Sequence, residues 1–336
     1  MKSRSLLLVS AAALGGVIAR HVYQRYQRDR HTSLTRLRAQ SDILETSLGS
    51  IEYAEEGVGP AVLVSHGAGG GFDQCLYCIN LLSGTNVRFV APSRFGYLRT
   101  PLPANPTPEA QADAFAALLD SLGVEKAAVM GFSAGGMAAL QFALRHPDRC
   151  RGLILVSAIT RPLAVSTPGA QRVGGAMLSN DFVFWAMSTY LRNLILASTG
   201  FSAADRARLA VEPHARRGMY GVLDFDPVTH RRGGMLNDIA QAAAFPICPL
   251  ERISAPTLIV HGTADPLVPF HFAALAANAI PQARFLILEG AGHLGWFTHA
   301  AQTRPAAREF FAAHAPQDKG TKGTQGITGN QVPSVP

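Results

Sequence analysis

The stretch Gly131-Phe132-Ser133-Ala134-Gly135 decides how this chain is expected to fold. It fits the pattern G-x-S-x-G, and it lies where an apolar run at 127–130 gives way to a small-residue, helix-like pattern at 136–140. A serine at such a sharp strand-to-helix turn is lifted out of the sheet and exposes its hydroxyl at the carboxyl end of the strand. The amino terminus of the following helix favours negative charge at that serine. The stretch therefore predicts a nucleophile, Ser133.

A serine hydroxyl needs a base that takes its proton, and the base needs a third group that orients it. Asp265 lies in a loop just past the β-branched run 258–260, and His293 follows the run 285–288 after two glycines. Both residues therefore fall in loops at the carboxyl ends of predicted strands. The order Ser133, Asp265, His293 along the chain is the Ser–Asp–His order of one fold family. These residues are predicted to form a catalytic triad.

A glycine-rich loop at 66–71 follows the buried run 61–65. Backbone N–H groups aimed at the oxyanion of an acyl-transfer intermediate lower its barrier by several kcal/mol, and glycines allow the close approach. We expect one donor to be the amide of Ala134 and the other that of Ala68, with Gly69 as the alternative. A phosphate loop is disfavoured, because neither the Walker nor the dinucleotide spacing is present. No metal or organic cofactor is expected.

The chain resembles the α/β-hydrolase superfamily over about residues 42–312. The matching motifs are His66-Gly67, Gly131-Phe132-Ser133-Ala134-Gly135-Gly136, the Gly-Thr-Ala-Asp turn ending at Asp265, and the Gly-Ala-Gly-His turn ending at His293. The segment 92–97 resembles that family's exit from its fourth strand, with Ser93 where aspartate is common and Leu98 where glycine is common. Serine at the nucleophile position argues against the branches of the family that need an aspartate nucleophile there.

Apolar runs alternate with helical stretches along most of the chain, which predicts an α/β fold with a mostly parallel, doubly wound sheet. Alternating residues from Leu44 to Glu55 predict an antiparallel hairpin at the N-terminal edge of that sheet. Thr107 followed by Pro108 marks a helix start. We expect one hydrolase domain over residues 42–315, a helical cap inserted at about 162–248, and a disordered tail at 316–336.

The N-terminal segment, residues 1–40, carries the net charge of the chain. The formal charge is +7, and this segment holds eight basic residues against one acidic residue, so the remainder is balanced and predicts no nucleic-acid binding. Its apolar run, residues 6–19, is short for a membrane-spanning helix. We expect a membrane anchor with a basic stretch held by anionic lipid that adds nothing to catalysis. A cleaved signal peptide, with a secreted or periplasmic product, and an organelle transit peptide are the alternatives.

Four cysteines in a chain of 336 residues do not predict a disulfide scaffold. Cys75 and Cys78 form the only close pair, and no second Cys or His pair stands at metal-binding spacing. Two buried helix cysteines are therefore favoured over a redox or metal half-site.

The motifs together predict a serine hydrolase that cleaves a carboxylic ester of a small or medium apolar substrate through an acyl-enzyme. The same residues could act on a lactone, a thioester or a carbon–carbon bond. A non-catalytic homologue that binds a ligand under the cap is the alternative from another class. The sequence gives no oligomeric state.

Overall fold

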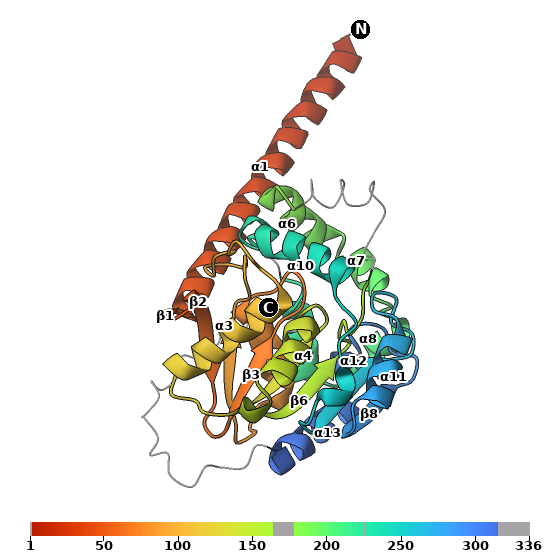
Figure 1. The fold of residues 1–336 in the computed structure, drawn as a ribbon. Helices are drawn as coiled ribbons and strands as arrows, with labels where there is room; N and C mark the ends of the chain where they lie inside the picture. The colour runs from red at the N-terminus through yellow and green to blue at the C-terminus, as the bar shows by residue number, and fades with distance from the viewer. Residues whose placement is uncertain (1, 164–177, 225, 315–336) are drawn as a thin grey trace.

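One sheet at the centre of the molecule positions the loops that carry the predicted site (Figure 1). The computed structural model describes residues 2–163, 178–224 and 226–314, with the backbone alone for residues 2–14. Within these residues an 8-stranded sheet has the order β1-β2-β4-β3-β5-β6-β7-β8. Its strands are β1 (Asp42–Thr46), β2 (Gly49–Glu56), β3 (Ala61–Ser65), β4 (Arg88–Pro92), β5 (Ala127–Phe132), β6 (Cys150–Val156), β7 (Thr257–Gly262) and β8 (Ala283–Leu288).

The direction of the strands confirms the predicted class. Strand β2 runs antiparallel to both of its neighbours, β1 and β4. From β4 to β8 every neighbouring pair is parallel. The fold is therefore a mostly parallel α/β sheet with an antiparallel N-terminal edge.

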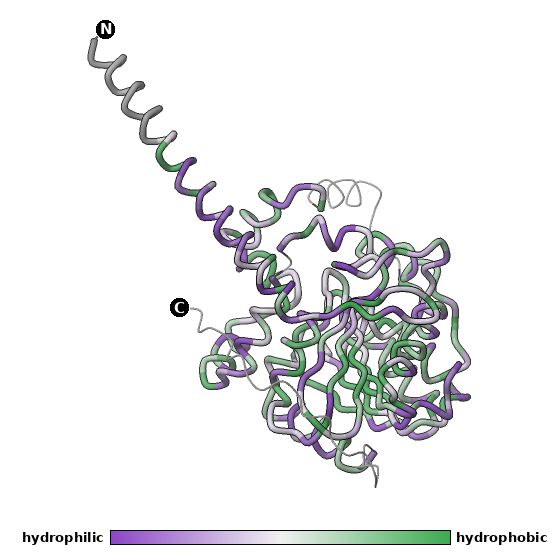
Figure 2. The backbone as a smooth tube through the Cα atoms, turned by 90° about the vertical axis from the view of Figure 1, so that its left-hand side faces the viewer, coloured by the Kyte–Doolittle hydropathy of each residue, from purple (hydrophilic) through white to green (hydrophobic). Residues whose placement is uncertain are grey.

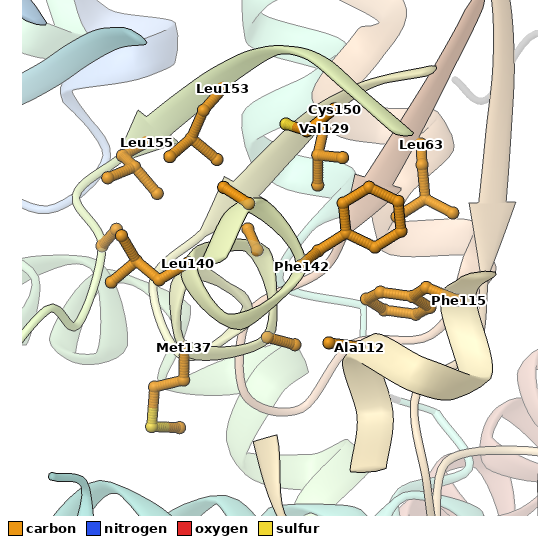
Figure 3. Close-up of a cluster of buried hydrophobic side chains, with 14 of the residues drawn as sticks. Leu63, Ala112, Phe115, Val129, Met137, Leu140, Phe142, Cys150, Leu153 and Leu155 are labelled. Carbon is orange, nitrogen blue, oxygen red and sulfur yellow. The ribbon is translucent and has the colours of Figure 1, made fainter. Parts of the chain in front are cut away.

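Successive side chains of the central strands pack into two separate apolar layers, one on each face of the sheet. In β5, Val129 belongs to one layer, while Ala128 and Met130 belong to the other. Figure 3 shows the first layer, where Phe115 and Phe142 lie beside the side chains of the strands. Because side chains alternate across a strand, an unbroken apolar run means burial on both faces.

Helices cover both faces of the sheet. The helices of the two faces are α2 (Phe72–Ile79), α3 (Pro108–Ser121), α4 (Gly135–Arg145), α11 (Phe270–Ala279), α12 (Gly295–Thr298) and α13 (Ala300–His314), with short 3-10 turns η1 (Asn80–Leu82) and η2 (Pro147–Arg149). The predicted start of α3 is confirmed, since the Thr107 hydroxyl accepts a hydrogen bond from the Ala110 amide at 3.2 Å. Cys75 and Cys78 are buried in α2 as free thiols, and burial raises the pKa of both.

Helices replace the strand–helix alternation between β6 and β7. They are α6 (Asp181–Tyr190), α7 (Arg192–Ser198), α8 (Ala203–Ala210), α9 (Pro213–Gly221) and α10 (Arg232–Ala244), with the 3-10 turns η3 (Val228–His230) and η4 (Leu250–Arg252). No strand occurs in the described part of this insertion. In Figure 1, α6 and α10 lie above the sheet, next to α1. Residues 164–177 of the expected cap, and the expected tail at 316–336, lie outside the described residues.

Helix α1 (Lys2–Ala39) differs from the separate segment that we expected. Its first half projects away from the body of the molecule in Figure 1, and Figure 2 shows its second half packed against the domain. Tyr26 is only 7% exposed and its ring contacts that of Phe182 in α6, with 5.2 Å between centroids. The Trp185 indole donates a hydrogen bond to Asp29 at 3.0 Å. Tyr26 and Asp29 thus dock the second half of α1 on α6.

An anchor that spans the membrane finds no support in the structure. Among the residues whose side chains are described, which for α1 are 15–39, no helix combines the length and the apolar character needed to cross a bilayer.

Candidate active site

Ser133 lies on a tight turn between β5 and α4. Its φ of 50° is left-handed, a conformation that a non-glycine residue keeps only where its surroundings enforce it. The Ser133 amide donates to the Val156 carbonyl, and the Ser133 carbonyl accepts from the Ile159 amide, both at 3.0 Å. A Cβ at Gly135 would collide with the Ser65 carbonyl oxygen. The turn therefore needs a glycine beside the serine, as the motif predicts.

The structure brings together the three residues that the sequence separates by up to 160 positions. The Nε2 atom of His293 lies 3.1 Å from Oγ of Ser133. Nδ1 of the same ring donates to Oδ2 of Asp265 at 2.8 Å. The other carboxylate oxygen, Oδ1, accepts from the amides of Leu267 and Val268 at 2.9 and 3.0 Å. Ser133, His293 and Asp265 thus form one hydrogen-bonded line.

The charge of Asp265 is stabilised although its side chain is 0% exposed. Burial raises the pKa of this carboxyl group, but hydrogen bonds from His261, His293 and the Val268 amide outweigh burial and hold the pKa well below its usual range. Asp265 is therefore a carboxylate at neutral pH, and it can only accept hydrogen bonds from the imidazole rings beside it.

The backbone of His293 is also fixed from two sides, a feature that sequence reasoning missed. Its amide donates to the carbonyl of Thr199, in the loop between α7 and α8, at 2.8 Å. Its carbonyl accepts from the hydroxyl of Ser157 at 3.1 Å. Ser157 directly follows β6 and has a left-handed φ of 45°. That backbone strain directly after a strand is the feature that marks Ser157 as part of the site.

The glycine-rich loop after β3 passes close to Ser133. A side chain at Gly67 would begin 3.2 Å from Cβ of Ser133. His66 is fully buried, and its Nε2 accepts a hydrogen bond from the Arg94 amide at 2.9 Å. Burial, then the Arg94 charge, hold the pKa of His66 well below its usual range. His66 is therefore a neutral, structural part of the loop rather than a second base.

The hydrogen bonds of the loop distinguish Ala68 from Gly69, the two residues that the sequence offers as the second oxyanion donor. The Gly69 amide donates to the Tyr97 hydroxyl at 3.2 Å, so it already has an acceptor. The amides of Ala68 and Ala134 have no acceptor within the described part of the chain. The amide of Ala68, the first choice from the sequence, is thus free of such an acceptor, whereas that of Gly69 is not.

A buried ion pair from the insertion holds the start of this loop. Both Arg94 Nη1 and Nη2 donate to the Asp238 carboxylate at 2.6 Å, and Arg94 Nε donates to the His66 carbonyl at 2.9 Å. The Tyr97 hydroxyl donates to Asp238 at 2.5 Å. Burial and then the Asp238 charge raise the pKa of Tyr97 well above its usual value, so the hydroxyl keeps its proton. Asp238 on α10 therefore fixes the groups that fix the loop.

A second buried ion pair holds the end of the loop. Arg231 is 0% exposed, and its Nη1 donates to the Gly70 carbonyl at 2.7 Å. The same guanidinium makes two hydrogen bonds with the Asp73 carboxylate, at 3.0 and 2.8 Å. Sequence reasoning missed both Arg231 and Asp238, whose charges gave no local sign of burial.

Comparison with known proteins places the chain in a family. Residues 60–300 match the alpha/beta hydrolase fold family. A solved alpha/beta hydrolase fold protein from Nakamurella multipartita is 30% identical with a TM-score of 0.69, and the match covers 82% of this chain and 99% of that chain. The chain therefore belongs to the alpha/beta hydrolase fold family, and it is a hydrolase of that family.

Two curated relatives carry more specific names. The pimeloyl-[acyl-carrier protein] methyl ester esterase of Aromatoleum aromaticum is 27% identical over 248 residues, covering 71% of this chain and 93% of the relative. The 2-hydroxymuconate semialdehyde hydrolase of Pseudomonas sp. (strain CF600) is 26% identical over 228 residues, covering 67% of this chain and 76% of the relative. One is named for ester cleavage and the other for a semialdehyde substrate, so the relatives share the fold and not one substrate.

Proposed function

We propose that the chain is a serine hydrolase that cleaves carboxylic esters of small or medium apolar substrates through an acyl-enzyme. The observation that carries this proposal is the hydrogen-bonded line from Ser133 through His293 to the buried carboxylate of Asp265. In this mechanism Ser133 Oγ attacks the carbonyl carbon while Nε2 of His293 takes its proton. The same nitrogen then returns the proton to the leaving alcohol.

The acyl-enzyme is hydrolysed by the reverse use of the same groups. His293 takes a proton from water, the water oxygen attacks the acyl carbon, and the proton returns to Ser133 as the acid leaves. Asp265 stabilises the charged imidazole ring without becoming protonated. The amides of Ala68 and Ala134 bind the oxyanion in both steps, and each such donor is worth about 100- to 1,000-fold in rate.

The proposed substrate size rests on the sequence and not on a cavity at the elbow. The cavity beside Ala134 has a volume of about 20 Å³, room for little more than one water molecule. Its lining mixes the apolar Phe95 and Met137 with the polar Gln111 and Asn237.

A fluorophosphonate probe tests the nucleophile without knowledge of the substrate. Wild-type protein should be labelled and Ser133→Ala should not, while Ser121→Ala, whose hydroxyl bonds only to the Ala117 carbonyl of its own helix, should still be labelled. Labelling that survives Ser133→Ala would refute the proposal. A series of p-nitrophenyl esters of increasing acyl length then measures the preferred acyl group, with the highest kcat/KM expected for short and medium chains.

The relative named as a semialdehyde hydrolase supports carbon–carbon bond hydrolysis as a second candidate. Turnover of 2-hydroxymuconate semialdehyde, the compound in that relative's name, that exceeds turnover of every ester in the series would favour it. Ligand binding with neither turnover nor labelling would instead indicate a non-catalytic homologue.

We also propose that the projecting part of α1 associates with an anionic lipid surface. Val17 and Ile18 are 65% and 54% exposed, and basic residues such as Arg20 follow them. Each basic residue near such a surface contributes about 1 kcal/mol. Full-length protein should float with vesicles containing phosphatidylglycerol but not with phosphatidylcholine alone, and salt should release it. Soluble protein from cells that begins at Arg20 would indicate a cleaved signal instead.

A further inference from the structure

The proposed mechanism leaves one buried imidazole beside the triad unused. His261 is the penultimate residue of β7, four residues before Asp265, and its side chain is 1% exposed. Its Nε2 lies 3.3 Å from Oδ2 of Asp265 and 3.0 Å from the carbonyl of Val268. Two imidazole rings, those of His261 and His293, therefore approach the same oxygen of Asp265.

The contacts of His261 determine which of its nitrogens carries the proton. Both neighbours of Nε2, the Asp265 carboxylate and the Val268 carbonyl, can only accept hydrogen bonds. Nδ1 is buried, and it has no partner in the part of the chain that the structure describes. A buried N–H without an acceptor is more costly than a bare lone pair. The ring is thus the Nε2–H tautomer, whose single N–H is shared between the two oxygens.

We propose that His261 is a positioning residue for the reaction. Its N–H holds Oδ2 of Asp265 in line with Nδ1 of His293, and it takes part of the negative charge on that oxygen. The same N–H ties the 266–268 turn to the carboxylate, whose other oxygen already accepts two amides of that turn. The carboxylate therefore has one orientation before substrate binds.

The charge that His261 takes from Oδ2 gives the proposal a readout that packing alone would not change. Without the N–H, the carboxylate carries more charge and stabilises the protonated ring of His293 more strongly. A protonated ring cannot act as the base. The acid limb of the pH profile should therefore move to higher pH when the N–H is lost.

Two substitutions separate the N–H from the bulk of the ring. His261→Gln places an amide N–H near the position of Nε2, while His261→Leu fills similar space with no donor. The second-order rate of fluorophosphonate labelling, measured from pH 5 to 9, needs only the nucleophile and its base. A hydrogen bond to a charged group corresponds to about 10- to 100-fold in rate. We expect His261→Leu to label that much more slowly, with its acid limb at higher pH, and His261→Gln to stay within about threefold of wild type.

Each outcome decides the proposal, which rests on the proposed function. Equal losses in both variants with an unmoved acid limb would show that the ring only fills space, and a wild-type rate and limb in His261→Leu would show that it does nothing for the triad. If His261→Leu does not fold, His261→Asn replaces it, because its amide reaches only the position of Nδ1 and the same loss is expected. Absence of labelling in wild type would instead refute the serine hydrolase itself.

Discussion

The substitution Asp238→Ala should lower the free energy of unfolding and slow fluorophosphonate labelling, because Asp238 holds the residues that hold the oxyanion loop. Asp238 and Arg94 are both buried, at 4% and 5% exposure, and two hydrogen bonds of 2.6 Å join them. Asp238→Ala leaves the Arg94 guanidinium buried without a counter-charge. Breaking a buried pair in this way costs about 3–5 kcal/mol, far more than the pair contributes in net terms. The Tyr97 hydroxyl also loses its acceptor.

A matched control exists on the surface. Asp113 and Arg145 form a pair of similar geometry, with an ion-pair distance of 2.7 Å, but their side chains are 31% and 43% exposed. Exposed pairs contribute about 0–1 kcal/mol because water and salt screen them. Asp113→Ala should therefore have a small effect on the free energy of unfolding, measured by urea titration with linear extrapolation.

The functional part of the prediction follows from what Arg94 and Tyr97 hold. Arg94 donates to the His66 carbonyl and Tyr97 accepts from the Gly69 amide, so the loop that presents Ala68 should loosen. Where Asp238→Ala still folds, its rate of fluorophosphonate labelling should fall at least tenfold, while Asp113→Ala labels at the wild-type rate. Equal free energies of unfolding for the two variants would refute the reasoning, since the buried pair would then be no more important than the exposed one.

Three further predictions test other parts of the structure. Burial, then Asp224 and Asp181, raise the pKa of Asp226 to about 7. Because this folded-state pKa exceeds the unfolded value, wild type loses stability as pH rises from about 4 through 7. The Tm of Asp226→Asn should therefore exceed that of wild type by an amount that grows over this window, and a Tm difference that does not change with pH would contradict the prediction. Gly135→Ala should destabilise the fold by more than about 2 kcal/mol through its collision with the Ser65 carbonyl, whereas Gly290→Ala, at a φ of 70° with open space around it, should cost about 1 kcal/mol in the same urea titration. Deletion of residues 1–40 should lower Tm by several degrees in a thermal melt, because Tyr26 and Leu37 are buried, while deletion of residues 1–19 should leave Tm unchanged.

The meeting of Ser133, Asp265 and His293 could be predicted because a local sequence pattern marks each of them. An apolar run followed by a turn marks the carboxyl end of a strand, and parallel strands bring those ends to one edge of the sheet. Ser133, Asp265 and His293 each follow such a run, so their meeting needs no knowledge of side-chain packing. Ala134 is predicted as an oxyanion donor together with Ser133, because it is the next residue in the chain. The choice of Ala68 over Gly69 needed the structure, since only Tyr97, from a distant loop, occupies the Gly69 amide.

The ion pairs that hold the loop could not be predicted, because they depend on how the inserted helices pack. Asp238 and Arg231 lie in helical patterns where a charge normally faces solvent, and their partners are more than 140 positions away. The departures from the family motif behave similarly. Leu98 takes a left-handed φ of 52° where glycine is common, and its amide donates to the His230 carbonyl at 2.7 Å, so the insertion supports a conformation that the sequence alone disfavours.

The N-terminal helix shows that the net charge of a segment does not reveal which of its charged residues form ion pairs with the rest of the chain. The sequence separates a segment with eight basic residues from a balanced remainder, and this split suggested that the whole segment faces lipid. In the structure, Arg30 lies 3.6 Å from Asp181 and Arg36 lies 3.2 Å from Asp224, both in the insertion. Two basic residues in the second half of α1 therefore have counter-charges in the insertion. We expect attraction to an anionic surface to act mainly through the projecting first half, and salt should weaken lipid binding through that half while α1 stays docked.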